Sequence, residues 1–223
     1  MNFAMNLEPH IAALLFLASG ASLVLLTLAS LVLLFWRRKY LPYTLRAIAV
    51  LAFGYGILLL TFSAFSHERT LARGQEKYLC ELDCHIAYSV QNVQRLKSIG
   101  NVNADGEFYV VTVCSRFDPT TIAPWRGDAP LTPNPHDVTL IDSRGQALKP
   151  SLAGQQTWNA AHGASALLLQ PLRPAESYDA TMVFDVPPGA SSARVLVSSE
   201  GFPMPVLIGD ESSLLHKKTY LAL

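Results

Sequence analysis

The residues best suited to chemistry lie close together near position 80. Residues 80–85 read Cys-Glu-Leu-Asp-Cys-His, so that Cys80 and Cys84 are separated by three residues and His85 follows the second thiol directly. Thiolate and imidazole groups suit copper and zinc. A Cys-x-x-x-Cys segment in a loop can place both sulfur atoms on one ion or let them bridge two ions. One of three interpretations of the cluster is therefore a soft-metal site formed by Cys80, Cys84 and His85.

Residues far along the chain could complete such a site. Met204 offers a thioether and His216 a second imidazole, and thioether, thiolate and imidazole ligands together favour copper. Segment 208–219, which contains His216, allows two other interpretations. It could be a charged loop before a last strand, or its Lys217 and Lys218 could meet lipid headgroups.

The thiols also allow interpretations without a metal. A disulfide between Cys80 and Cys84 needs Cα atoms about 4.4–6.8 Å apart, which a turn permits and an extended strand does not. An oxidising compartment would favour this pairing. Alternatively, both thiols are unpaired structural cysteines. Cys114 lies within an apolar run, where we expect a small core residue; as the odd thiol it could itself be the disulfide partner.

Familiar catalytic signatures are missing from the sequence. There is no Gly-x-Ser-x-Gly motif and no phosphate-binding glycine loop, and His67-Glu68 lacks the second histidine of a zinc-protease helix. His136 and His162 fall in loops rich in proline or glycine, where surface positions are expected. Although triads can assemble from scattered residues, we predict a protein that is not an enzyme.

Two long uncharged runs precede these residues. Charged residues form only 15% of the chain, against about 25% in soluble domains, and residues 11–36 and 47–65 contain none. A membrane-spanning helix needs about 20 apolar residues. The first run is too long for a cleaved signal peptide and follows a tail, residues 1–10, without lysine or arginine. We therefore predict two transmembrane helices joined by residues 37–46.

The connector between the runs predicts their orientation. It contains Arg37, Arg38, Lys39 and Arg46 and no acidic residue, so the positive-inside rule places it in the cytoplasm. Both termini would then face outward, in a multi-pass protein of the inner cell membrane with an extracytoplasmic domain. The reverse topology would place that domain in the cytosol.

Several residues of the runs suggest how the helices sit and pack. Trp36 and Tyr43 fall where an aromatic belt would lie. Gly20, Gly54 and Gly56 are small enough to let two helices approach closely, or they are ordinary residues of lipid-facing helices.

The rest of the chain predicts a mostly-β domain. Residues 66–79 are polar and read as a stalk or helical extension, and residues 80–223 as a β-sandwich in which short apolar runs alternate with turn signals. The predicted strands are 85–90, 107–117, 137–141, 146–148, 164–169, 178–184, 194–198 and 219–223. Residues 101–106 are predicted to form a hairpin loop, and 119–135 an ordered proline-containing loop.

Three segments carry a resemblance to a known group. The order Phe-Tyr-Val-Val-Thr-Val at 108–113, Thr-Leu-Ile-Asp-Ser-Arg-Gly at 139–145 and Val-Phe-Asp-Val-Pro at 183–187 resembles the immunoglobulin-like, telokin-like domains of bacterial membrane proteins and lipoproteins. The resemblance covers residues 107–207. It implies an immunoglobulin-like β-sandwich and an outward location, and it implies no particular activity, because that group has none in common.

The overall plan is also similar to subunit II of cytochrome oxidases, which has two N-terminal spans, a β-sandwich and a binuclear copper site. In that family, however, the Cys-x-x-x-Cys motif lies late in the sandwich and is followed by His and Met. Here Cys80 and Cys84 open the domain and no methionine follows closely. The plan therefore fits while the copper motif does not.

These observations predict a membrane-anchored, non-enzymatic binding or accessory protein of the cell envelope. Its expected partners are the lipid bilayer and another membrane or envelope protein. Nucleic acid is excluded as a partner because residues 66–223 carry more acidic than basic side chains. The alternative function is a copper-binding or electron-transfer module built on Cys80, Cys84 and His85.

Overall fold

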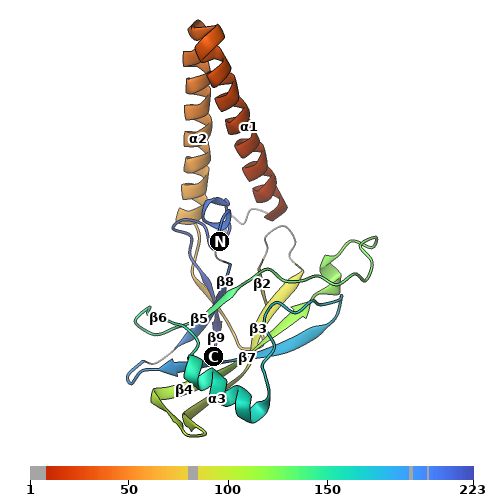
Figure 1. Ribbon diagram of the computed structural model, residues 1–223, viewed down its shortest axis with the longest axis vertical. Helices are drawn as coiled ribbons and strands as arrows, with labels where there is room; N and C mark the ends of the chain where they lie inside the picture. The colour runs from red at the N-terminus through yellow and green to blue at the C-terminus, as the bar shows by residue number, and fades with distance from the viewer. Residues whose placement is uncertain (1–8, 80–84, 191–192, 200) are drawn as a thin grey trace. The chain divides into compact units, whose positions relative to one another are not determined.

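The computed structural model describes residues 9–79, 85–190, 193–199 and 201–223, and the chain divides into two compact units (Figure 1). The described part of the first, the hairpin unit, comprises residues 9–67 and 201–217. The second, the sandwich unit, comprises residues 68–79, 85–190, 193–199 and 218–223. Each unit is described by itself below.

The hairpin unit contains two long helices, α1 (Pro9–Trp36) and α2 (Leu41–Ala64), joined through the short helix η1 (Arg38–Tyr40). Both helices are long and apolar enough to cross a membrane. The connector is shorter than the predicted residues 37–46, because α2 already begins at Leu41. Pro42 is compatible with this start, since a first-turn residue needs no N–H partner within the helix.

Hydroxyl groups rather than glycines mark the contact between α1 and α2. The Ser30 Oγ donates to Thr44 Oγ1 at 2.8 Å. A Cβ atom placed on Gly20, Gly54 or Gly56 would meet nothing within 4 Å. The interpretation of these glycines as close-packing positions is therefore wrong, and they are ordinary residues of helix surface.

The sandwich unit is built from two sheets with the predicted mostly-β character. One sheet has the strand order β1-β9-β8-β5-β6 and the other β2-β3-β4-β7. The strands of the first sheet are β1 (Arg69–Leu71), β9 (Thr219–Ala222), β8 (Arg194–Ser198), β5 (Asp137–Ile141) and β6 (Ala147–Leu148). Those of the second are β2 (Lys77–Tyr78), β3 (Ile86–Ile99), β4 (Val102–Phe117) and β7 (Ser177–Val186).

Alternating side chains of the long strands build the main core between the sheets. On β4, Tyr109, Val111 and Val113 are buried toward the opposite sheet, where Leu140 and Val195 belong to the same cluster. This is the period-two pattern of a strand with one face toward a core. Short helices η2 (Pro119–Thr121) and η3 (Met204–Val206) occur in loops.

The predicted stalk, residues 66–79, is not helical. β1 pairs in parallel with β9, and β2 pairs antiparallel with β3. The segment was predicted as a stalk because its residues are polar. They belong to β1 and β2, which are edge strands with one face exposed to solvent. The segment belongs to the sandwich from Glu68 onward.

The predicted hairpin loop at residues 101–106 is also wrong. The turn between β3 and β4 lies at Gly100 and Asn101, and β4 begins at Val102. Gly100 has φ +56°, a conformation that glycine adopts without a steric penalty. The two strands therefore continue as a long ribbon through polar residues.

Helix α3 (Leu152–His162) was not predicted, and it covers the outer surface of β4 and β7. Ser151 caps it by accepting a hydrogen bond from the Gly154 amide at 3.3 Å. Gly154 must be small, because a Cβ atom there would lie 2.8 Å from Val183 Cγ1. Residues 164–169, predicted as a strand, are irregular backbone instead.

Candidate functional site

Four ionisable side chains form a cluster on the outer face of the β2-β3-β4-β7 sheet. This Arg116 cluster consists of Glu76, Tyr78, Arg116 and Asp118. Tyr78 pairs with Ala87, which pairs with Arg116, so that one row crosses three strands. The small Ala87 side chain leaves room for the longer side chains on either side to meet above it.

The contacts within the Arg116 cluster are short and mutually satisfying. The Arg116 guanidinium donates to both Glu76 carboxylate oxygens, at 2.5 and 2.7 Å. The Tyr78 hydroxyl lies 2.5 Å from Asp118 Oδ2, and Asp118 also accepts from the Thr120 amide at 3.0 Å. Fork-shaped arginine–carboxylate pairs are among the strongest charge-assisted hydrogen bonds.

These contacts keep every group of the cluster in one protonation state near neutral pH. The hydrogen bond from Tyr78 and those from Thr120 lower the pKa of Asp118 to about 2. Arg116 lowers the pKa of Glu76. Burial, followed by the bond to Asp118, raises the pKa of Tyr78 well above its usual range. With these pKa values, no group of the Arg116 cluster is suited to act as a general acid or base near pH 7. The contacts of the cluster hold the short strand β2 to the end of β4.

His85 lies beside the Arg116 cluster. Its backbone oxygen accepts from the Asp118 amide at 2.8 Å. Its ring stacks on Phe117 with centroids 5.7 Å apart, and its Nδ1 is 2.8 Å from Thr121 Oγ1. The other predicted core ligands, Cys80 and Cys84, lie outside the described residues.

The two distant ligands belong to the hairpin unit. Met204 is buried in a cluster with Ala12 and Leu207, and His216 Nδ1 is 2.8 Å from the Lys217 carbonyl oxygen. Within the described parts of the chain, no group of three or more His, Cys, Asp or Glu side chains could hold a metal. The metal site and the disulfide thus remain predictions.

Cys114 is not the apolar core residue that its sequence context suggested. It lies half-buried on the outer face of β4, directly opposite Asp179 on β7. Burial, followed by the Asp179 carboxylate, raises the pKa of its thiol to about 11. The thiolate form is scarce at neutral pH, so this cysteine is a poor nucleophile.

Two further ionisable residues lie between the sheets. Lys77 is 4% exposed, and its Nζ donates to the carbonyl oxygens of Val197 at 2.6 Å and Thr219 at 2.8 Å. His136 packs its ring edge against Tyr88. Burial, followed by the charge of Lys77, lowers the pKa of His136 to about 4. His136 is therefore not the surface residue predicted from its loop.

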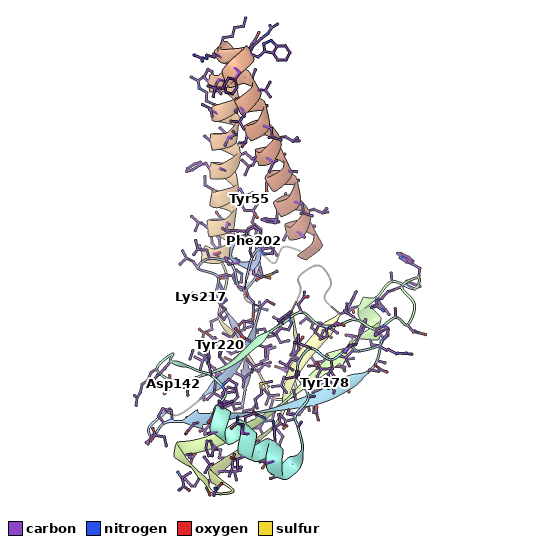
Figure 2. All side chains as sticks on the ribbon, in the orientation of Figure 1. Tyr55, Asp142, Tyr178, Phe202, Lys217 and Tyr220 are labelled. Atoms are coloured by element: carbon purple, nitrogen blue, oxygen red, sulfur yellow. The ribbon has the colours of Figure 1, made fainter. Side chains whose placement is uncertain are left out.

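The residues that carry the family resemblance have structural roles (Figure 2). Asp142 ends β5, and its Oδ1 accepts from the amides of Arg144 and Gln146, each at 2.8 Å, which forms the turn into β6. Asp185 on β7 accepts from the Asp105 amide at 3.0 Å. Both aspartates accept hydrogen bonds from backbone amides and so stabilise the local turn and strand geometry.

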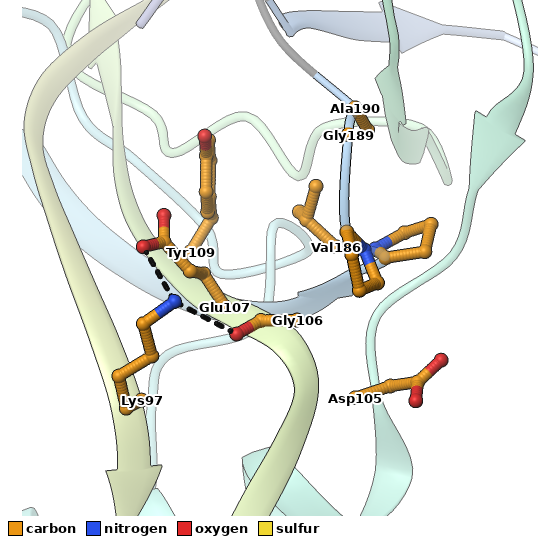
Figure 3. A pocket seen from close by; sticks show the side chains of 10 residues that line it. Lys97, Asp105, Gly106, Glu107, Tyr109, Val186, Gly189 and Ala190 are labelled. Atoms are coloured by element: carbon orange, nitrogen blue, oxygen red, sulfur yellow. Dashed lines mark hydrogen bonds and ion pairs between the residues drawn. The ribbon is translucent and has the colours of Figure 1, made fainter.

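Two of the hollows on the described part of the sandwich unit are large enough to consider as binding sites. One, of about 400 Å³, lies between the end of β7 and the start of β4 (Figure 3). On one side of it, the Lys97 ammonium bridges the Glu107 carboxylate at 3.0 Å and the Gly106 carbonyl at 3.3 Å. Because the lysine is paired in this way, the hollow presents no unoccupied charge for a small anionic ligand.

The second hollow, of about 390 Å³, lies between α3, β7 and the loop 165–169. Leu167 and Leu169 line it and are 70% and 41% exposed, and Leu152 at the start of α3 is 74% exposed. Gln155 and Asn159 add amide groups to the wall. Exposed leucines around a few polar groups are typical of a surface that contacts another molecule.

Sequence reasoning missed the Arg116 cluster and Lys77. In a strand, neighbouring side chains point to opposite faces, so Lys77 inward and Tyr78 outward is the expected arrangement. A strand as short as β2, however, is too short for this alternation to be recognised in the sequence. Asp118 is two residues from Arg116, but Glu76 and Tyr78 are distant in sequence, and only the pairing of β2 with β3 and of β3 with β4 brings them to Arg116.

The fold and site define a class: a two-sheet β-sandwich attached to two N-terminal helices that have the apolarity of membrane spans. A family model described as "Domain of unknown function (DUF4352)" matches residues 83–203. The chain therefore belongs to this family. The matched region runs from β3 through β8 and excludes α1, α2 and β9.

Solved structures resemble the chain in part, and no match was found among curated proteins. A secreted protein of Mycobacterium tuberculosis, MPT63, aligns with a TM-score of 0.44 and 10% identity over 70% of this chain and 98% of its own. The yjhA protein of Bacillus subtilis aligns with a TM-score of 0.41 and 13% identity over 67% and 98%. A conserved hypothetical protein of Bacillus anthracis gives 0.39 and 17% over 56% and 91%.

Proposed function

We propose that this protein is a membrane-anchored binding module of the cell envelope. The helices α1 and α2 cross the inner membrane twice, and the sandwich lies on the extracytoplasmic side, where it binds another membrane or envelope protein without catalysing a reaction. The observation that carries this proposal is the exposed apolar surface of the two helices.

That surface surrounds both helices. Leu25 on α1 is 66% exposed, and Val50 and Phe53 on α2 are 72% and 73% exposed. Only 11% of the most apolar stretch of either helix is buried. A surface helix of a soluble protein buries its apolar stripe and presents a polar face. A helix that is apolar all round and lacks a protein cover is stable in hydrocarbon.

The orientation is supported by the residues between the helices. Arg37, Arg38 and Lys39 lie where α1 ends and α2 begins, close in sequence to the exposed Trp36 and Tyr43. Basic residues favour the cytoplasmic side, and tryptophan and tyrosine favour the membrane–water interface.

Binding, rather than catalysis, is supported by the state of the polar groups. The Arg116 cluster is closed by its own ion pairs, and the raised pKa of Cys114 disfavours its thiolate. The apolar hollow beside α3, with exposed Leu167 and Leu169 in its wall, is the surface we assign to the partner. The immunoglobulin-like assignment of the sandwich is part of the same proposal, supported by its two sheets and the parallel pairing of β1 with β9.

The copper alternative rests on Cys80, Cys84 and His85 alone. The contact between His85 Nδ1 and Thr121 Oγ1 does not choose between this alternative and the accessory role, because a histidine that binds a metal through one ring nitrogen commonly forms a hydrogen bond through the other. Metal analysis of the purified full-length protein under reducing, metal-replete conditions tests it; stoichiometric copper would replace the accessory role with an electron-transfer role.

Membrane extraction tests the anchor. After expression of the full chain, we expect the protein to stay in the membrane pellet after an alkaline carbonate wash and to dissolve only in detergent. Release into the supernatant without detergent would contradict insertion.

Photo-crosslinking tests the partner surface. A photoreactive amino acid at Leu167 should give one discrete adduct of higher mass in cells, whereas the same group at the exposed, polar Asp128 should not. Equal labelling from both positions would contradict a binding surface beside α3.

A further inference from the structure

We infer that residues 201–217 form a third membrane contact: Phe202 and the leucines of this segment insert into the outer leaflet beside the helical hairpin. The inference rests on the proposed function, since it requires that α1 and α2 span the bilayer. It adds a lipid-binding element at the C-terminal end of the chain, far in sequence from the anchor.

The 201–217 segment packs against α1 through apolar side chains. Phe202 meets Phe16 edge-on, with ring centroids 5.7 Å apart. Met204 and Leu207 are 8% and 4% exposed and share a buried cluster with Ala12, while Phe16 packs at its edge. This contact joins the first turns of α1 to a segment nearly 200 positions later in the chain.

The segment also contacts α2 through a hydrogen bond. The Tyr55 hydroxyl donates to the Val206 carbonyl oxygen at 2.7 Å, and Figure 2 shows Tyr55 and Phe202 at the same end of the hairpin unit. Tyr55 lies inside the apolar run of α2, where an unpaired hydroxyl in hydrocarbon would be costly. The hydrogen bond to the Val206 carbonyl offsets that cost. It therefore requires that the 201–217 segment lie at the depth of Tyr55 along α2.

The depth of this contact follows from helix geometry. Phe16 lies about 20 residues before Trp36, the last residue of α1, which corresponds to about 30 Å at 1.5 Å per residue. The hydrocarbon core is also about 30 Å thick. With Trp36 at the cytoplasmic interface, Phe16 lies at the outer hydrocarbon boundary, and the ring of Phe202 lies at the same level.

Three large apolar side chains of the segment are exposed. Phe202 is 82% exposed, Leu214 56% and Leu215 72%. Leu214 belongs to the same fold of the chain, because its amide donates to the Pro205 carbonyl at 3.0 Å. Large apolar side chains exposed on one short segment would be unfavourable in water.

Lipid is the occupant that this position selects. The exposed ring of Phe202 continues the exposed apolar surface of α1, on which Leu14 and Leu17 are 64% and 59% exposed. A surface continuous with lipid-facing helix meets the same acyl chains. Lys217 follows directly, and its amide donates to Ser66 Oγ just after the end of α2, so a cation stands at the headgroup level.

Depth-dependent fluorescence quenching tests the inference. In the full-length protein with Trp36, Trp125 and Trp158 replaced by phenylalanine, Phe202→Trp and Leu215→Trp are each reconstituted into vesicles of lipids brominated either near the carbonyl end or near the methyl end of the acyl chain. Leu25→Trp, near the middle of α1, is the matched control for the span itself.

We expect loss of emission for Phe202→Trp and Leu215→Trp, larger with bromine near the carbonyl end, and loss for Leu25→Trp that is larger with bromine near the methyl end. Quenching of Leu25→Trp alone would overturn the inference and leave the anchor intact. Blue-shifted emission at position 202 without bromine quenching would also overturn it, because a protein would then cover the segment. No quenching at any position would overturn the proposed anchor and the inference with it.

Discussion

Lys77 is a charged residue held between two sheets, and its ammonium links β2 of one sheet to two adjacent strands of the other. It belongs to β2, and it donates to Val197 on β8 and Thr219 on β9. The long aliphatic stem can pack in the core while the ammonium satisfies carbonyl oxygens at the sheet ends. A residue of this kind contributes to stability because its removal leaves buried acceptors unpaired.

We expect Lys77→Met to lower the free energy of unfolding by roughly 2–4 kcal/mol, because methionine fills the space but leaves the carbonyls of Val197 and Thr219 without this donor. Urea unfolding of the full chain in detergent, followed by tryptophan fluorescence, measures it. Lys97→Met is the control: Lys97 is 77% exposed on its side chain and should cost less than about 1 kcal/mol. Equal effects of the two substitutions would refute the role of Lys77.

His136 makes the sandwich sensitive to mild acid. Its pKa is lowered from 6.5 to about 4 in the folded state, so between these values the unfolded chain binds a proton that the folded chain does not. The free energy of unfolding therefore falls as the pH is lowered through this window, by roughly 2–3 kcal/mol from this group. The contribution of Asp118, whose pKa is lowered from 3.8 to about 2, is lost only at lower pH.

The His136→Gln variant should lose most of this dependence. Urea midpoints at pH 7 and pH 4.5 compare the two proteins, and we expect the shift between the two pH values to be smaller in the variant. An unchanged shift would show that another group controls acid stability.

At the scale of elements, α3 protects an edge of the sandwich. β7 is the last strand of its sheet, and its free backbone groups are taken by side chains and loops. Gln155 donates to the Thr181 carbonyl at 3.1 Å and accepts from the Val183 amide at 2.9 Å. The Thr181 amide donates to Ser165 Oγ at 2.6 Å. Covering an edge in this way prevents pairing with another chain.

Gln155→Ala should therefore lower stability by about 1–3 kcal/mol, since two edge groups lose their partner, and should speed hydrogen exchange at the Val183 amide. Gln156→Ala, at the exposed neighbouring position, is the matched control and should change neither. Unaltered exchange at Val183 in the Gln155 variant would argue against edge protection by α3.

The same element shows where sequence reasoning reaches its limit. Strand 137–141 was predicted with its observed bounds, because Val138 and Leu140 alternate with polar residues and Asp142 announces the turn. Helix α3 was not predicted. Its contacts with β7 are formed by Gln155, and a contact with a strand distant in sequence leaves no periodic pattern in residues 152–162. Residues 164–169 look like a strand, yet Ser165 uses its side chain, rather than its backbone, to bond β7. In the candidate site, His85 stays a predicted metal ligand, whereas Glu76 and Tyr78 reach Arg116 and Asp118 only through sheet pairing.

At the scale of the whole molecule, the chain combines a family domain, matched over residues 83–203, with two N-terminal helices that are long and apolar enough to cross a membrane. The polar groups of the Arg116 cluster and of Lys77 are paired within the sandwich. Exposed large apolar side chains lie on α1, α2, the 201–217 segment and the hollow beside α3, and also at Trp125 and Leu152. The two-sheet core thus provides a scaffold, and the exposed apolar side chains provide surfaces that can contact lipid or another protein. The proposed accessory role is based on this distribution.

The topology of the C-terminus tests this account most directly. We would fuse to Leu223 of the full-length chain an enzyme that is active only after export to an oxidising compartment, and in parallel a fluorescent protein that matures only in the cytosol. The account predicts an active enzyme and a dark fluorescent fusion, with both fusions found in the membrane fraction. A bright fluorescent fusion with an inactive enzyme would place the sandwich in the cytosol and contradict the account.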